Sequence, residues 1–110
     1  PGIFSKRFMS GFKNKNECLK YIINKSRHNN KAFFQTSICL TLKQNYHIVF
    51  NGKINGIISK SISGEEGFGY DPIFIPDGFK KTFSSMSLIE KNSISHRSIA
   101  IRKLINFLSN

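Results

Sequence analysis

An alternation with a period of two residues over positions 34–42 constrains the fold of this 110-residue chain more than any other feature. One set of alternate positions is apolar or β-branched: Phe34, Thr36, Ile38, Leu40 and Leu42. The positions between them are Gln35, Ser37, Cys39 and Thr41. Because successive side chains of a strand point to opposite faces, this run is typical of a strand that is buried on one face.

Turn signals and a second β-rich stretch follow this strand. Gln44 and Asn45 are turn residues, residues 46–50 are β-rich, and Asn51 with Gly52 forms a strong hairpin signal before residues 53–62. The sequence therefore predicts three antiparallel strands. Residues 73–75, between two turns rich in proline, aspartate and glycine, predict a further short strand.

Capping patterns place helices near both ends of the chain. Asn14 precedes Glu17 by three residues, and apolar residues at helical spacing follow, which predicts a helix over residues 16–27. Ser87 and Glu90 match a capping box that opens a short helix. Ser95 can cap a final helix whose inward face is expected to hold four residues, Ile101, Leu104, Ile105 and Leu108. The expected fold class is mixed α/β (α+β), an antiparallel β-ribbon plus a short strand with flanking helices.

The composition excludes a membrane protein. No apolar run approaches the roughly 18 residues that span a bilayer, and residues 1–13 lack the apolar middle of a signal peptide, so we expect a cytoplasmic location. Cys18 and Cys39 have no partner at metal-ligand spacing and are expected to be reduced core residues. His28 and His47 belong to no motif and are expected at the surface or in a strand.

The formal net charge of +11 allows a nucleic-acid partner, because Lys and Arg release counterions from a phosphate backbone. The basic residues are, however, strewn along the chain from Lys6 to Lys103, and they form no dense cluster. A nucleic acid is therefore an unfavoured partner. A basic nucleic-acid-binding module remains an alternative function, as does a remnant that binds nothing.

Residues 64–97 hold the parts of a nucleotide site. A glycine-rich run carries the aromatic Phe68 and Tyr70, and Asp71 follows. Glycines let a ligand approach the main chain closely, and aromatic faces stack on bases. Lys91, His96 and Arg97 then surround a predicted helix start, where cations and unpaired N–H groups favour phosphate or a base. Taken singly, each of these residues is also compatible with a core, capping or surface role.

The string GFGYDPIFIPDGFKKTFSSMSLIEKNSISHRS closely resembles the inosine triphosphate pyrophosphatase family, also called non-canonical purine NTP or dITP/XTP pyrophosphatases. Its anchors, in the order and spacing of the family, are residues 68–72, Thr82 with Phe83, Met86 with Ser87, residues 90–92 and residues 94–98. Residues 1–5, PGIFS, also match the PG[IV][YF]S segment of that family. The resemblance implies the C-terminal part of an elongated α/β fold that commonly forms a homodimer.

The resemblance implies hydrolysis of ITP, dITP or XTP to the monophosphate and pyrophosphate, with Mg²⁺ bridging the triphosphate. It assigns the nucleoside pocket to Phe68, Gly69, Tyr70 and Asp71. It assigns substrate binding to Lys91 and recognition of the base to His96 and Arg97. The chemistry of Arg97 fits this role, because a guanidinium only donates hydrogen bonds. The 6-oxo group of these purines accepts them, whereas the 6-amino group of adenine does not.

Other motifs of the family precede its PG[IV][YF]S segment: a TGNxxK phosphate motif, a metal-binding acid and the aspartate of a DDSG-like motif. None of them occurs in this sequence. We therefore expect a single incomplete domain over residues 1–110, without catalytic residues or Mg²⁺ ligands. Glu65 and Glu66 are adjacent and would diverge, so they are not expected to bind metal. The chain alone is predicted to be inactive, and a separate N-terminal half is a candidate partner.

Overall fold

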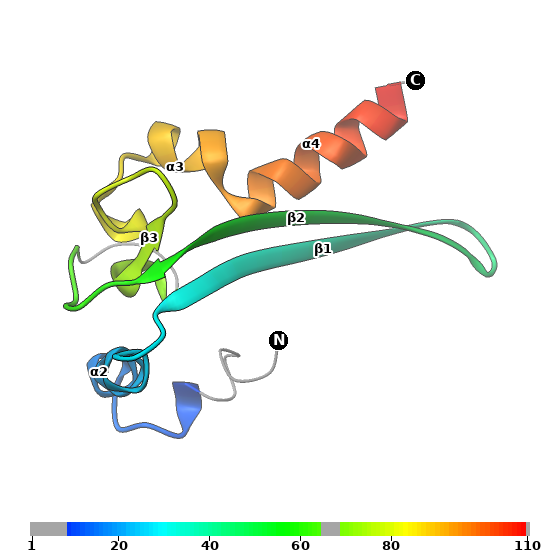
Figure 1. Ribbon diagram of the computed structural model, residues 1–110. Coiled ribbons are helices and arrows are strands. Elements are labelled where there is room, and N and C mark those ends of the chain that lie inside the picture. The colour runs from blue at the N-terminus through cyan, green and yellow to red at the C-terminus, as the bar shows by residue number, and fades with distance from the viewer. Residues whose placement is uncertain (1–8, 65–68, 110) are drawn as a thin grey trace. The chain divides into compact units, whose positions relative to one another are not determined.

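The computed structural model describes residues 9–64 and 69–109 (Figure 1). The chain divides into two compact units. The first unit comprises Pro1–Ala32 and Gly56–Met86, and the second comprises Phe33–Asn55 and Ser87–Asn110. Along the described chain, α2 precedes a pair of long strands and a short third strand, and α3 and α4 follow; the strands form one antiparallel sheet in the order β1-β2-β3. The predicted mixed α/β fold class is confirmed.

Helix α2, Lys15–Lys25, begins where the capping pattern predicts it. The Asn14 side chain accepts a hydrogen bond from the Glu17 N–H at 2.9 Å, which satisfies one of the free donors of the first turn. At the other end, the Ser26 N–H donates to the Ile22 carbonyl at 3.0 Å. The buried face of α2 consists of Cys18, Leu19 and Ile22.

Strands β1, Lys31–Lys43, and β2, Tyr46–Ile58, form a long hairpin (Figure 1). The tight turn between them includes Asn45 at φ 66°, a left-handed conformation that asparagine tolerates. The predicted alternation in β1 is confirmed from Phe34 to Leu40, because these residues are half-buried at every second position. The prediction is wrong for Leu42, which is exposed near the turn. The predicted hairpin turn at Asn51 and Gly52 is wrong, because β2 continues through both residues.

Close packing against helix α4, His96–Ser109, explains the glycine at position 52. A Cβ on Gly52 would collide with the His96 carbonyl oxygen and would lie 2.7 Å from the Ala100 nitrogen. Figure 1 shows the beginning of α4 next to β2. The Lys103 ammonium also donates to the Asn51 carbonyl at 2.7 Å. This glycine therefore serves helix packing, whereas the same dipeptide in a hairpin would serve a turn.

The face of α4 that packs on the ribbon differs from the predicted one. The His96 ring meets Phe34 edge-on with centroids 5.2 Å apart, and Phe107 packs on Phe50 at 5.7 Å. Ala100 between them is fully buried. Of the four residues that were expected to face inward, Leu104 is half-buried, while the others are exposed: Ile101, Ile105 and Leu108. The prediction failed because the close approach to Gly52 selects the small side chain of Ala100.

The short strand predicted over residues 73–75 is β3, Phe74–Pro76, and it pairs with the end of β2. In this register Ile57 faces Ile75 and Ile58 faces Phe74. The core of the first unit joins α2 to the end of β2 and to the residue before β3, and it consists of Cys18, Leu19, Ile22, Ile58 and Ile73. Phe74 also packs on Phe83 of the 3₁₀ turn Phe83–Ser85, with ring centroids 5.4 Å apart.

The two cysteines differ in environment. Cys18 is buried as predicted, whereas Cys39 is exposed on the outer face of β1, so its assignment to the core is wrong. The strand alternation explains this result, since Cys39 lies among the residues that point away from the packed face. His28 and His47 are exposed, as expected. No helix within residues 9–64 and 69–109 is long and apolar enough to cross a bilayer.

Candidate functional site

Gly69, Tyr70 and Asp71 stand together where a 3₁₀ turn, Asp71–Ile73, begins in the first unit. Gly69 has φ +47°, a conformation that suits glycine, and among the described residues other than its chain neighbours none places an atom within 4 Å of the position of a Cβ. Pro72 sits at the first turn of the 3₁₀ helix, where its fixed φ is favourable. The Ile73 N–H donates to the Tyr70 carbonyl at 3.1 Å and closes the turn.

Tyr70 and Asp71 differ in how far they are buried. Asp71 is buried. The half-buried Tyr70 packs against the core cluster formed by α2 and the strand ends. Burial raises the pKa of the Tyr70 hydroxyl above its usual 10.0, and the neighbouring Cys18 thiolate adds to this effect. The hydroxyl is therefore neutral at physiological pH and can both donate and accept a hydrogen bond.

Lys91, His96 and Arg97 lie around the junction of two helices in the second unit. Helix α3 covers Leu88–Ile94, and α4 follows after Ser95. The Ser95 N–H donates to the Lys91 carbonyl at 2.9 Å, while the Ser95 hydroxyl accepts from the Ser98 N–H at 3.1 Å. The predicted caps at Ser87 and Ser95 are both confirmed, and these two serines fix where the helices begin.

The three side chains at this junction have different surroundings. His96 is half-buried, its Nδ1 atom is buried, and its ring packs against Phe34. Lys91 is half-buried on α3. Arg97, one residue into α4, is exposed. Arg97 is thus exposed at this junction, whereas the His96 ring packs on Phe34 of β1.

The seven predicted site residues therefore fall into two sets. Gly69, Tyr70 and Asp71 belong to the first unit, while Lys91, His96 and Arg97 belong to the second. Phe68 lies outside the described residues. The residues of each set lie near one another within their own unit. A pocket shared by both sets stays a prediction.

Sequence reasoning gave no role to Thr82, which the structure places beside the first set. Its hydroxyl donates to the Ser63 carbonyl at 2.7 Å and lies 3.3 Å from the Ser85 hydroxyl. The Ser63 hydroxyl is in turn 3.2 Å from that of Ser85. The sequence marks Thr82 as part of an anchor of the family motif. Only the fold shows that its hydroxyl binds the Ser63 carbonyl.

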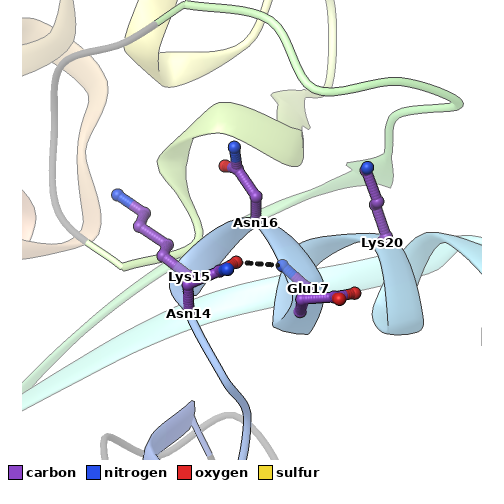
Figure 2. Close-up of a pocket in the computed structure, with 5 residues that line it drawn as sticks. All are labelled: Asn14, Lys15, Asn16, Glu17 and Lys20. Carbon is purple, nitrogen blue, oxygen red and sulfur yellow. Dashed lines mark hydrogen bonds between the residues drawn. The ribbon is translucent and has the colours of Figure 1, made fainter.

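Two clefts in the first unit are lined by other residues. Figure 2 shows one of about 460 Å³ at the start of α2, where Lys15, Asn16 and Lys20 point to one side. The second, of about 680 Å³, lies between the end of α2 and residues 58–62. Among the described residues that line these two clefts, none comes from the predicted site. Both clefts thus differ from the expected nucleoside pocket.

The described residues do not fit a magnesium centre. Hard divalent cations take several oxygen ligands, usually including carboxylates. Within residues 9–64 and 69–109, no group of three or more His, Cys, Asp or Glu residues is arranged to hold a metal ion. Glu65 and Glu66 lie outside the described residues.

Comparison with known proteins identifies the family. The Ham1 family matches residues 1–107. The chain belongs to the Ham1 family. Its relatives include proteins named dITP/XTP pyrophosphatase from Christiangramia forsetii, 42% identical over 99% of this chain, and from Flavobacterium psychrophilum, 42% identical over 100% of it. The resemblance inferred from the motifs is confirmed.

Solved structures of the Ham1 family share the fold. The Staphylococcus aureus Ham1 protein is 35% identical and covers 99% of this chain with a TM-score of 0.86. A HAM1 protein from Coxiella burnetii gives the same TM-score at 30% identity. The chain spans 58% of the length of each of these structures, and the same share of the two curated relatives. The matched region includes both sets of predicted site residues.

Proposed function

We propose that this chain provides the purine-recognising part of a nucleoside triphosphate pyrophosphatase. The proposed reaction adds water across the anhydride bond between the α- and β-phosphates of ITP, dITP or XTP, which releases the monophosphate and pyrophosphate. The observation that carries the proposal is the match of the Ham1 family over residues 1–107, together with relatives named dITP/XTP pyrophosphatase that are 42% identical.

Base selection is assigned to Arg97 with His96. The guanidinium of the exposed Arg97 offers only donors, so it pairs with the 6-oxo acceptor of hypoxanthine or xanthine. Adenine would place its amino donor against these donors and leave both unsatisfied. A site that depends on such pairing rejects the wrong base strongly, by about 10⁴-fold in favourable cases. His96 holds the first turn of α4 against β1 through Phe34, which supports a fixed position for the neighbouring Arg97.

The remaining predicted residues are assigned to the nucleoside and the phosphates. Gly69, Tyr70 and Asp71 form the nucleoside wall, for which the positive φ of Gly69 and the neutral Tyr70 hydroxyl are suitable. Lys91 supplies a point charge for a phosphate. From the sequence, Phe68 is proposed to stack on the base, at about 1–3 kcal/mol.

Hydrolysis itself is proposed to need more than residues 1–110. Phosphoryl transfer depends on positioning water and neutralising charge, commonly with Mg²⁺. We propose that these groups come from a polypeptide equivalent to the remainder of the relatives, supplied as a separate half or as more of the same chain. A homodimer and a cytoplasmic location are further parts of the proposal.

Calorimetric titration of the purified chain with ITP and with ATP tests this function. We expect saturable binding of ITP that is at least about 100-fold tighter than binding of ATP. Arg97→Ala should remove the difference between the two nucleotides. Arg102→Ala is a matched control, because it removes the same charge from another exposed position of α4 and should leave the preference intact.

Three results would contradict the proposal. One is equal affinity for ITP and ATP, and another is the absence of nucleotide binding. The third is tight binding to DNA or RNA with a steep salt dependence, which would favour the nucleic-acid-binding alternative. A pyrophosphate assay with ITP and Mg²⁺ should show negligible release of pyrophosphate by residues 1–110 alone. Robust turnover would refute the proposal that hydrolysis needs groups from outside these residues.

A further inference from the structure

Thr82 and Phe83 form an anchor of the family motif, and the proposed function assigns no role to either residue. Thr82 is 1% exposed, and Phe83 is buried against Phe74. A buried threonine must satisfy its hydroxyl, and this one donates to the Ser63 carbonyl at 2.7 Å. The bond joins positions 19 residues apart in the sequence, so it is part of the tertiary structure and not of a local turn.

Ser63 stands at the beginning of the run that carries Gly69, Tyr70 and Asp71. Its N–H donates to the carbonyl of Pro72 at 2.9 Å, so the two ends of this run are tied to each other. The carbonyl of the same serine is the group that Thr82 binds. Ser63 therefore receives one bond from the Thr82 hydroxyl and uses its other main-chain group to hold Pro72.

Gly64 shows how closely this run approaches the segment around Thr82. Its φ is +88°, and a Cβ at this position would lie 2.7 Å from both the carbonyl carbon and the Cβ of Ser84. Real Cβ atoms do not approach backbone so closely. The Ser85 hydroxyl adds contacts of 3.2 Å to the Ser63 hydroxyl and 3.3 Å to that of Thr82. Residues 82–85 thus hold the start of the run by hydrogen bonds and by shape.

We propose that Thr82 is a positioning residue for nucleoside binding, acting through Ser63. The hydroxyl fixes the Ser63 carbonyl, Ser63 fixes Pro72, and the turn that presents Gly69, Tyr70 and Asp71 is placed as a result. This inference rests on the proposed function, because it assumes that the turn contacts the nucleoside. A methyl group in place of the hydroxyl would leave the Ser63 carbonyl facing an apolar atom, which is the costly way to lose a hydrogen bond.

The test measures amide hydrogen exchange and ITP affinity in Thr82→Val and Thr82→Ser. We expect Thr82→Val to lower the protection of the Ser63 amide about ten-fold and ITP affinity by a similar factor. Thr82→Ser keeps the hydroxyl and should stay within about two-fold of the native protein in both measurements. The Ser59 amide, which donates to the Ile73 carbonyl at 2.7 Å, reports whether the sheet end remains folded.

Ser85→Ala is a milder second variant in case Thr82→Val does not fold. It removes an exposed hydroxyl that touches both partners, and we expect a two- to three-fold loss of Ser63 protection and of ITP affinity. The proposal is overturned if Thr82→Val keeps native Ser63 protection and native ITP affinity, or if Thr82→Ser loses as much as Thr82→Val. If native protein binds no ITP, the proposed function and the binding role of Thr82 both fail, whereas the exchange data still decide whether the hydroxyl holds Ser63.

Discussion

The two units of this chain bury their side chains in different ways. In the first unit, α2, the strand ends and the 3₁₀ turns enclose large residues, and Leu19, Ile73, Phe74 and Phe83 are almost inaccessible to solvent. In the second unit, helix α4 lies on a two-stranded ribbon, and among the residues of this unit that the structure describes, Ala100 is the one hydrophobic side chain classed as buried. The first unit thus depends on a core, whereas the second depends on the close approach of a helix to the ribbon and on the aromatic contacts beside it.

Because of this difference, the two sets of site residues are held in place by different contacts. Gly69, Tyr70 and Asp71 are placed by buried neighbours and by the bonds of Ser63 and Thr82. Lys91, His96 and Arg97 are placed by two serine caps and by the approach of α4 to Gly52. Nucleoside binding by Gly69, Tyr70 and Asp71 should therefore tolerate substitutions at the surface of the first unit and be lost when its core is truncated. Base recognition by His96 and Arg97 should be sensitive to the distance between α4 and β2.

The largest expected effect comes from a truncation in the core of the first unit. Phe74 is fully buried, so Phe74→Ala should destabilise that unit by about 3–5 kcal/mol. Phe107→Ala is the matched change in the second unit, where the ring is 40% exposed, and it should cost about 1–2 kcal/mol. Hydrogen exchange resolved by residue measures both. Equal losses in the two units would contradict the contrast drawn between them.

A smaller effect is expected at the contact between helix and strand. Gly52→Ala places a methyl group against the His96 carbonyl, so α4 must shift, at about 1–3 kcal/mol. The His96 ring resonances and the preference for ITP should change together. Gly78→Ala is a control, because that glycine has φ +85° but no atom within 4 Å of its Cβ position, so only backbone strain is introduced. Unchanged His96 resonances in Gly52→Ala would show that the contact is loose.

These contrasts also show how far the sequence could predict the structure. Helix caps at Asn14, Ser87 and Ser95 were predictable, because each depends on a side chain and an N–H only a few residues apart. The role of Gly52 was not, because the same dipeptide suits a hairpin turn or a close helix contact, and only tertiary packing distinguishes them.

The candidate site was predictable to a similar extent. The resemblance to the family located its residues, and the structure confirms the predicted starts of α3, which carries Lys91, and of α4, which carries His96 and Arg97. The bond from Thr82 to Ser63 was not predictable, because it joins distant positions through a main-chain carbonyl that every residue type possesses. Sequence patterns report side-chain chemistry, so contacts to backbone atoms far along the chain leave no direct signal.

Alkaline pH should weaken the first unit more than the second. Burial raises the pKa of the Cys18 thiol above its usual 9.0, and burial with the nearby thiolate raises the pKa of Tyr70 above 10.0. The unfolded chain therefore loses these protons at a lower pH than the folded chain. The stabilisation is complete below pH 9 and declines as pH rises through the folded-state values. Thermal denaturation from pH 7 to 11 measures this decline, which Cys18→Ala should reduce.

The smallest effect on stability is expected at the exposed apolar residues of α3, in the second unit. Leu88 is 72% exposed and Ile89 is 85% exposed, so the double change to serine removes little burial. Surface substitutions usually alter stability by less than about 0.5 kcal/mol, and we expect exchange protection in the second unit to stay within that limit. The same change should reduce self-association, because neighbouring exposed apolar side chains favour contact between molecules. Sedimentation velocity of the native and double-variant proteins measures it. A loss of more than about 2 kcal/mol, in the range of a truncated core residue, would show that these side chains are covered in solution, and would remove the contrast between the two units.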